Sequence, residues 1–438
     1  MAIDDAIAPG VAGVGRSRGF ILTMVTLVYV VNYLDRNILA IALPEIKQEF
    51  LLSDAALGFL SGTAFAITYA TLAMPLAWIA DRANRRNVIA GSMALFSAMT
   101  VVCAFAANTL QLVIARVFTG VGEAGTGPSI QSIISDLYPP KQRGAALSIY
   151  SSGLNIGLLI AFFGGGLVVQ YYGWRAAFLV SGLPGLILVL IFLFAVPEPP
   201  RGHVEKLVDK GRAPSFLSTV AFLWSQRSFR WLAIGTALSA FGGYAGITFI
   251  PLFLTVSHGM SPAARGFALA VLTGIAGGFG TYIAGVLADR LGKRDVRWNM
   301  WVPICFIVIA MPFTPFFYLL PNLFVALLCA IVPTMNGAAY LAPSLAMTQA
   351  LVPLRMRAQA AAILLFILNI IGYALGPLCV GQLSDLLRPT LGNDSIRWAM
   401  LSTVIPWIAS GFCYWFASKH LAGDLRRGSG AASGAVSG

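Results

Sequence analysis

Long apolar stretches alternate with short polar ones along almost the whole chain. An apolar run of about 20 residues is long enough to cross a bilayer as a helix. Twelve such runs are present, at 19–43, 55–80, 87–107, 109–136, 144–169, 174–196, 229–256, 264–288, 299–320, 322–350, 358–384 and 395–418. The pattern predicts an all-α membrane protein with twelve transmembrane helices.

Composition supports this class and excludes others. Of the 438 residues, 58% are hydrophobic and 11% are charged, whereas a soluble protein carries about 25% charged residues. The five cysteines lie in apolar runs without metal-like spacing, so we expect neither a disulfide nor a metal site. The three histidines lie outside the deep parts of the spans, which argues against a membrane-embedded metalloenzyme or acyltransferase. No nucleotide-binding loop is present, and we expect no cofactor.

The basic residues predict the orientation of the chain. If residues 1–17 are cytoplasmic, the inner segments hold 22 of the 29 lysines and arginines, and the outer segments hold five. This asymmetry is a strong positive-inside signal. It places both termini in the cytoplasm and makes the first span an uncleaved anchor, in what we expect to be a bacterial inner membrane. Because the basic residues are scattered among short loops, the net charge of +12 does not indicate nucleic-acid binding.

The spans divide six and six around one long loop. We expect a cytoplasmic tail at 1–17, a six-helix bundle at 18–196, a cytoplasmic linker at 197–228, a second bundle at 229–418 and a disordered tail at 419–438. The two halves repeat, because Ala80-Asp81-Arg82 after the second span matches Ala288-Asp289-Arg290 after the eighth. Asn155 and Asn369 fall at equal distances along the fifth and eleventh spans. Two like halves joined by a linker are typical of a rocker-switch transporter.

These two Asp-Arg loops resemble the cytoplasmic signature of the major facilitator superfamily. The loop after the second span departs from the usual form, with Ala77 and Asn84 in place of its glycines, whereas Gly285 and Gly292 follow the form. The resemblance implies a cytoplasmic gate that closes when the site faces outward. Its candidate residues are Asp81, Arg82, Arg85, Arg143, Asp289, Arg290, Arg294 and Arg357. A loop that serves only to orient the chain is the alternative.

The first span places two charges in the membrane, in the stretch Asn32-Tyr33-Leu34-Asp35-Arg36-Asn37. Each charge costs at least a few kcal/mol there unless it faces a partner or water. Asn32, Asp35 and Arg36 share one helical face at about 100° per residue. Two interpretations remain open: an Asp–Arg pair that only stabilises the bundle, and a polar site at the centre of a transporter.

The fourth span carries a second pair of buried charges. Arg116 and Glu123 are seven residues apart and therefore share a face. Helix geometry puts Asp35 and Arg116 at one depth and Glu123 one to two turns deeper. A buried, incompletely paired carboxylate is stabilised in its protonated form, so Asp35 and Glu123 are the candidates for proton coupling, with Arg36 or Arg116 receiving an anionic group. A closed salt-bridge network that does not titrate is the alternative.

A narrower resemblance rests on three stretches: Asn32 to Arg36, Arg116 to Ala124, and Ser135 to Gly144. In this order they are similar to the Spinster family, and the resemblance implies transport of lysophospholipids or sphingosine 1-phosphate. Two stretches around the sixth span, Trp174 to Phe178 at its start and Glu198 to Gly202 just after it, resemble bacterial members. Anion:cation symporters for sugar acids carry a similar Asp-Arg and Gly-x-Gly-Glu.

The second half differs from the first, since its spans contain no internal charge. The candidate substrate-binding residues of this second half are Phe241, Tyr244, Asn336, Tyr340 and Asn369. Those of the first half are Asn32, Arg36 and Arg116. A charged half facing an aromatic half suits an amphipathic anion, although these aromatic residues could equally be packing. We therefore expect a monomeric, proton-linked transporter of a lipid-like anion, in contact with membrane lipids. A proton symporter of small organic anions is the second hypothesis, and a receptor or membrane enzyme is a distant third.

Overall fold

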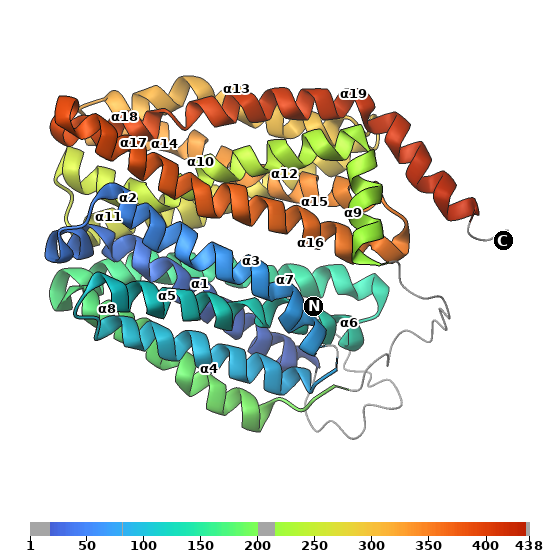
Figure 1. Cartoon of the computed structure of the whole chain (residues 1–438), viewed down its shortest axis with the longest axis horizontal. Helices are drawn as coiled ribbons and strands as arrows, with labels where there is room; N and C mark the ends of the chain where they lie inside the picture. Colours follow the sequence, from blue (N-terminus) through green and yellow to red (C-terminus); the bar gives the residue numbers. More distant parts are fainter. Residues whose placement is uncertain (1–17, 81, 200–214, 435–438) are drawn as a thin grey trace. The chain divides into compact units, whose positions relative to one another are not determined.

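The computed structural model describes residues 18–80, 82–199 and 215–434, and in these ranges it contains helices and no strand (Figure 1). The elements of the first part of the chain are α1 (Arg18–Phe50), α2 (Asp54–Gly58), η1 (Phe59–Thr63), α3 (Ala64–Ala80), α4 (Arg85–Ala104), α5 (Thr109–Ala124), α6 (Thr126–Leu137), α7 (Pro140–Leu159), η2 (Ile160–Gly164) and α8 (Gly165–Ala195).

The second part begins at α9. Its elements are α9 (Phe216–Ser225), α10 (Arg227–His258), α11 (Pro262–Leu269), η3 (Ala270–Ala276), α12 (Gly277–Gly292), α13 (Trp298–Leu319), α14 (Leu323–Ala339), α15 (Leu341–Ala350), η4 (Leu354–Met356), α16 (Arg357–Ile367), η5 (Leu368–Ala374), α17 (Leu375–Leu391), η6 (Gly392–Asp394), α18 (Ser395–Leu401) and α19 (Val404–Gly434).

The described residues contain nine helical stretches that are long and apolar enough to cross a membrane. Two of them, Gln142–Ala195 with 54 residues and Arg357–Arg426 with 70, are long enough for two crossings each. The predicted fourth span is divided at Gly125 into α5 and α6, of 16 and 12 residues. The all-helical membrane fold is confirmed, and the total of twelve spans stays a prediction.

The chain forms two compact units. Unit 1 comprises residues 1–42 and 68–209, and unit 2 comprises residues 43–67 and 210–438. The clusters therefore differ from the predicted bundles in one respect, because the end of α1, all of α2 and η1, and the start of α3 belong to unit 2. The boundaries of the two predicted bundles themselves stay a prediction.

In unit 1, α4 packs against both α5 and α8 (Figure 1). Glycines allow the helices to approach closely, as is common between membrane helices. A Cβ at Gly122 of α5 would lie 2.6 Å from the backbone nitrogen of Phe96, and one at Gly182 of α8 would lie 2.8 Å from the carbonyl oxygen of Ser97. This close packing holds Ser97 of α4 in the middle of the unit.

In unit 2, α10 packs along α19 and against η5, and α14 packs against α12 and α13 (Figure 1). The buried core joins apolar side chains from α10, α13, α16 and α19, including Leu232, Met300, Leu364, Trp407 and Tyr414. Inside this core the helices are joined by hydroxyl groups. Ser239 and Ser410 lie 2.7 Å apart, and the Tyr414 hydroxyl lies 3.0 Å from Ser344.

In the described ranges, four π-helical turns interrupt the long helices, and they fall in matching spans of the two halves. The turns η1 and η3 lie in the second and eighth predicted spans, and η2 and η5 lie in the fifth and eleventh. These spans correspond to one another in the sequence repeat. A π-turn inserts an extra residue into a helix and is frequent at functional sites, so the two halves share local distortions as well as motifs.

The C-terminal tail is more ordered than its composition indicates. The sequence predicts disorder in 419–438, whereas α19 continues to Gly434. The first part of the tail is firmly packed. Its Asp424 accepts hydrogen bonds from the backbone nitrogen and the hydroxyl of Ser228, at 2.9 and 2.8 Å. Once a helix is anchored in this way, each further residue adds one hydrogen bond and the helix extends even through a poor sequence.

Candidate functional site

The polar stretch of the first span lies in the middle of α1 and faces the interior of unit 1. Asp35 is fully buried and Asn32 is buried, while the Arg36 side chain keeps 10% of its surface exposed. Their spacing on a 3.6-residue helix turns all three toward α4 and α5. Charges in such a position must find partners or water, and the structure supplies several partners.

Arg36 forms an ion pair with Glu123 of α5. Its Nε lies 3.0 Å from Oε2 of Glu123, and its Nη2 contacts the same oxygen. The rings of Tyr33 and Tyr69 flank the guanidinium, each with its centroid 5.2 Å from Cζ. Glu123 is fully buried, and Asn32 lies next to it. Aromatic rings next to a guanidinium help to hold its plane in a fixed orientation.

Asp35 is held by different neighbours. Its Oδ2 accepts a hydrogen bond of 3.2 Å from the hydroxyl of Ser97. Its backbone carbonyl lies 3.5 Å from Nη1 of Arg116, a fully buried arginine of α5 that lies near both carboxyl groups. The other oxygens, Oδ1 of Asp35 and Oε1 of Glu123, are buried and accept no hydrogen bond from the described residues.

The site therefore contains two carboxylates and two guanidiniums at the centre of unit 1. The prediction that Asp35 and Arg116 share a depth agrees with their contact. Depth alone did not reveal that Glu123 pairs with Arg36, because the long arginine side chain reaches a different turn from its own Cα. With one oxygen of each carboxylate left without a hydrogen-bond donor among the described residues, the charges are only partly compensated.

A tyrosine cluster beside this site was missed at the sequence level. Tyr29 stacks on Tyr150 of α7 with ring centroids 4.3 Å apart, and its centroid lies 4.9 Å from that of Tyr33. Gly157 of α7 permits this approach, since a Cβ there would lie 2.6 Å from the Val30 carbonyl. The spacing of Tyr29 and Tyr33, four residues apart on the face of a polar stretch, was the available signal.

The candidates in unit 2 are only partly brought together. Tyr244 of α10 stacks on Tyr373 of η5, with centroids 4.3 Å apart. Asn369 also lies in η5, and its amide donates to the Leu365 carbonyl of its own helix at 2.8 Å. Asn336 and Tyr340 are buried in and next to α14, and Phe241 is half-buried in α10. A single cavity lined by all five residues stays a prediction.

Of the gate residues in unit 1, Arg85 is the most firmly held. It is buried and pairs with Asp136, and its Nε lies 2.9 Å from Oε1 of Glu198. Its Nη2 also donates to the Pro199 carbonyl at 2.8 Å. Glu198 in turn accepts from the backbone nitrogen of Arg86 at 2.8 Å. Arg85 thus ties the start of the linker to the beginning of α4.

The other gate candidates are held less firmly. Arg82 lies over the Trp78 ring at 4.0 Å, and Arg143 donates to the Ser135 carbonyl at 2.8 Å. Asp81 lies outside the described residues. In unit 2 the candidates are exposed and form no ion pair with another described residue; they are Asp289, Arg290, Arg294 and Arg357. The cytoplasmic gate stays a prediction.

A second polar cluster, at the opposite end of the helices in unit 2, was not predicted. The carboxylate of Asp385 accepts hydrogen bonds from the backbone nitrogens of Asp54 and Ala55, at 2.9 and 2.8 Å. It thereby satisfies the first free amides of α2, as a capping carboxylate does. Nearby, the fully buried Arg265 pairs with Glu45 at 2.5 Å.

No group of three or more His, Cys, Asp or Glu side chains is placed to hold a metal ion in the ranges that the structure describes.

Comparisons with known proteins point to one family. The family model of the Major Facilitator Superfamily matches residues 25–377. An MFS-type efflux pump of Mycolicibacterium smegmatis is 32% identical over 92% of this chain and 93% of its own length. The sphingosine-1-phosphate transporter SPNS2 of Xenopus tropicalis is 27% identical over 85% of this chain and 75% of its own.

Two further similarities bear on the fold and the ligand. A probable sulfoacetate transporter of Cupriavidus necator is 30% identical over 64% of this chain and 66% of its own length. The crystal structure of a bacterial homolog of the human lysosomal transporter Spinster, inward-facing and unoccupied, matches with a TM-score of 0.85 and 30% identity, covering 93% of this chain and 98% of that one.

Proposed function

This chain belongs to the major facilitator superfamily, and from that premise we propose that it couples protons to the export or uptake of an amphipathic anion. Membership makes it a secondary transporter of the inner membrane and not an enzyme. The proposed substrate is a lysophospholipid or a lipid like sphingosine 1-phosphate, moved by rocker-switch alternating access. Asp35 and Glu123 are the proposed proton carriers.

The buried charge cluster of unit 1 is the observation that carries this proposal. Arg36 is paired with Glu123 through one carboxylate oxygen. If Glu123 takes a proton, this buried ion pair loses its negative charge, which costs several kcal/mol. An anionic head group that replaces the carboxylate removes this cost. Proton binding and anion binding therefore favour each other, and Arg36 is suited to a phosphate because its fork binds two oxygens.

The lipid character of the substrate is supported by the contrast between the units. Arg36 and Arg116 offer an anion site, whereas Tyr244 and Phe241 offer aromatic surface without charge. One relative is named as a sphingosine-1-phosphate transporter.

A small organic anion is the second candidate. A relative named as a probable sulfoacetate transporter is 30% identical to this chain, and the charge cluster of unit 1 suits a sulfonate or carboxylate equally well. The two candidates differ only in whether the substrate needs an apolar chain.

One binding experiment tests the proposal. The purified chain is screened by thermal shift against lysolipids of increasing chain length and against sulfoacetate and sugar acids, with Arg116→Ala and the charge-preserving Arg116→Lys alongside. We expect stabilisation by lysolipids that Arg116→Ala abolishes and Arg116→Lys retains in part. Stabilisation by the short anions alone would favour the second candidate. Stabilisation that Arg116→Ala leaves intact would remove Arg116 from the binding site and leave Arg36 as the candidate.

A further inference from the structure

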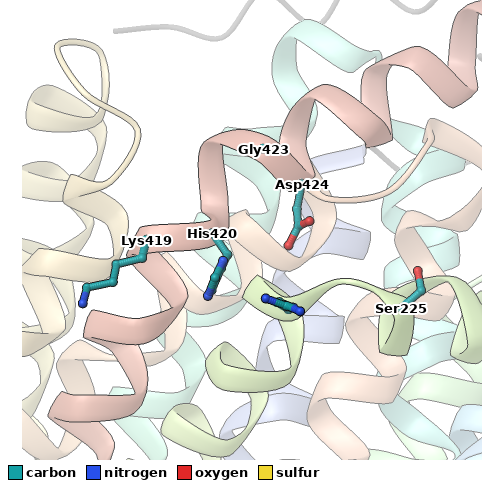
Figure 2. A pocket seen from close by; sticks show the side chains of 6 residues that line it. Ser225, Lys419, His420, Gly423 and Asp424 are labelled. Carbon is teal, nitrogen blue, oxygen red and sulfur yellow. The ribbon is translucent and has the colours of Figure 1, made fainter.

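A cavity in unit 2 lies where α9 ends and α10 begins, next to the C-terminal part of α19 (Figure 2). Its volume is about 480 Å³, and it is lined by Ser225, Arg227, Lys419, His420, Gly423 and Asp424. Its lining residues belong to α9, α10 and α19, and none of them belongs to the charge cluster described above. By the distribution of basic residues, this end of the helices faces the cytoplasm.

The cavity carries an excess of positive charge. Arg227 is exposed, and neither Arg227 nor His420 forms a side-chain hydrogen bond or ion pair within the described part of the chain. The Lys419 ammonium lies 3.4 Å from the centre of the Trp415 ring, which orients it without neutralising it. The one carboxylate of the lining, Asp424, is already engaged, because its Oδ2 accepts from the nitrogen and the hydroxyl of Ser228 at 2.9 and 2.8 Å.

Aromatic residues mark the membrane interface beside this cavity. Trp231 stacks on Phe416 with centroids 5.0 Å apart, and Trp231 and Trp415 are 36% and 37% exposed. Each tryptophan lies about one helical turn from a cation of the cavity, Arg227 or Lys419. Tryptophan concentrates at the level of the lipid head groups. Beyond this level, exposed apolar side chains continue along α10 and α19, including Ile234 and Phe412.

We propose that this cavity binds the phosphate head group of an anionic phospholipid from the cytoplasmic leaflet. Arg227, Lys419 and His420 supply donors for the phosphate oxygens, since basic pockets between helices on this side of the membrane bind such head groups. The acyl chains lie along the exposed apolar side chains of α10 and α19. This neighbouring surface distinguishes a lipid from a soluble phosphate ester, which would use the cavity alone. A bound lipid bridges the start of α10 to α19.

Lipid retention measured on the full chain tests this inference. The protein is placed in phosphatidylcholine nanodiscs with a small fraction of phosphatidylglycerol, and the lipid that remains bound is quantified by native mass spectrometry. The variant Arg227→Gln/Lys419→Gln is compared with Lys293→Gln/Arg297→Gln, which removes two exposed cations at the same predicted end but outside the cavity. Loss of two charges near the membrane surface predicts a fall of roughly tenfold or more in phosphatidylglycerol retention for the first variant, and little change for the second.

Three results would overturn the inference. They are equal retention of phosphatidylcholine and phosphatidylglycerol by the wild-type chain, equal losses in the two double variants, and displacement of the lipid by millimolar inorganic phosphate or glycerol phosphate. The last result would assign the cavity to a soluble phosphate compound. The wild-type comparison does not depend on any variant, and the single variant Lys419→Gln, which keeps the Arg227 side chain, guards against misfolding of the double variant.

Discussion

The two units of this transporter place their polar groups in different ways. In unit 1 four ionisable side chains, Asp35, Arg36, Arg116 and Glu123, meet in the middle of the helices. In unit 2 the middle of the helices is joined by neutral hydroxyl groups, and the buried charges of Asp54 and Arg265 lie near the starts of α2 and α11. The same repeated helical pattern therefore supports a cluster of ionisable groups in one half and a neutral interior in the other.

This difference indicates that buried hydroxyl groups and buried charges have different roles in the two units. Hydroxyl pairs such as Ser239–Ser410 and Tyr414–Ser344 stabilise contacts between membrane helices and keep the same charge at any ordinary pH. Buried charges at mid-helix cost more, and they are typical of ion and substrate pathways. If this division is correct, substitutions in unit 1 alter coupling, and substitutions at the helix ends of unit 2 alter stability.

The largest effect is expected from Arg36→Ala. Removing one partner of a buried ion pair costs about 3–5 kcal/mol, because the other charge is left buried without compensation. We expect anion binding to fall by on the order of a hundredfold, and thermal stability to fall as well. The measurement is anion-dependent thermal shift together with uptake into proteoliposomes.

Two variants control for a general loss of structure. Arg175→Ala removes an arginine that lies over the Trp174 ring at 4.2 Å in α8, outside the cluster, and should leave anion binding intact. Arg36→Ala/Glu123→Gln removes both charges and should recover stability but not binding. If the double variant binds the anion as well as the wild-type chain does, Arg36 is not the anion site.

The next effect is expected from Asp385→Ala at the helix end of unit 2. Two backbone amides of α2 lose their acceptor, and loss of a helix cap of this kind costs about 1–2 kcal/mol. Thermal unfolding in detergent should detect the loss, while the pH dependence of uptake stays unchanged. Asp394→Ala, which removes an exposed carboxylate paired with Arg397 at 3.3 Å, should change stability by less than about 0.5 kcal/mol. A changed pH dependence in Asp385→Ala would contradict the division between the units.

The sequence predicts features that depend on neighbouring residues, but not contacts between residues that are far apart along the chain. The apolar runs predict the helices, and polar residues inside them predict the buried charge cluster, because a charge in a membrane span always needs an explanation. Which polar residues pair with one another is harder to predict from the sequence. Asp385 contacts Asp54 from 331 residues away, and Glu198 reaches Arg85 across 113 residues. Such pairs follow from how helices pack, which no local pattern records.

The breaks within helices were also beyond the sequence. A run such as 109–136 is uniformly apolar or small, yet it divides at Gly125 into α5 and α6. The π-turns η3 and η5 lie in stretches that read as continuous helix. Hydrophobic period locates a helix but not an extra residue within it, because one insertion shifts the period by only about 100°.

A smaller effect is expected from Glu123→Gln. A pH difference of one unit can support about tenfold accumulation for each coupled proton, and a glutamine cannot carry a proton. We therefore expect uptake by this variant to lose that stimulation while it still binds substrate. Glu49→Gln changes an exposed glutamate later in α1 and should keep the wild-type response. An undiminished pH response in Glu123→Gln would leave Asp35 as the only carboxylate of the cluster able to couple.

The smallest effect is expected in unit 2, from Tyr244→Ala. This change removes an aromatic pair with Tyr373, which contributes about 0.5–1.5 kcal/mol to stability. It also removes aromatic surface proposed to contact the lipid chain, so we expect a loss of a few-fold to tenfold in affinity for long-chain lysolipids. Short-chain lysolipids should bind as before, because the proposed anion site, Arg36 and Arg116, is unchanged. Affinity is measured as a function of acyl chain length, with Tyr244→Phe as the variant that keeps the ring. If the dependence on chain length is the same in all three proteins, Tyr244 does not contact the lipid chain, and the neutral interior of unit 2 serves packing only.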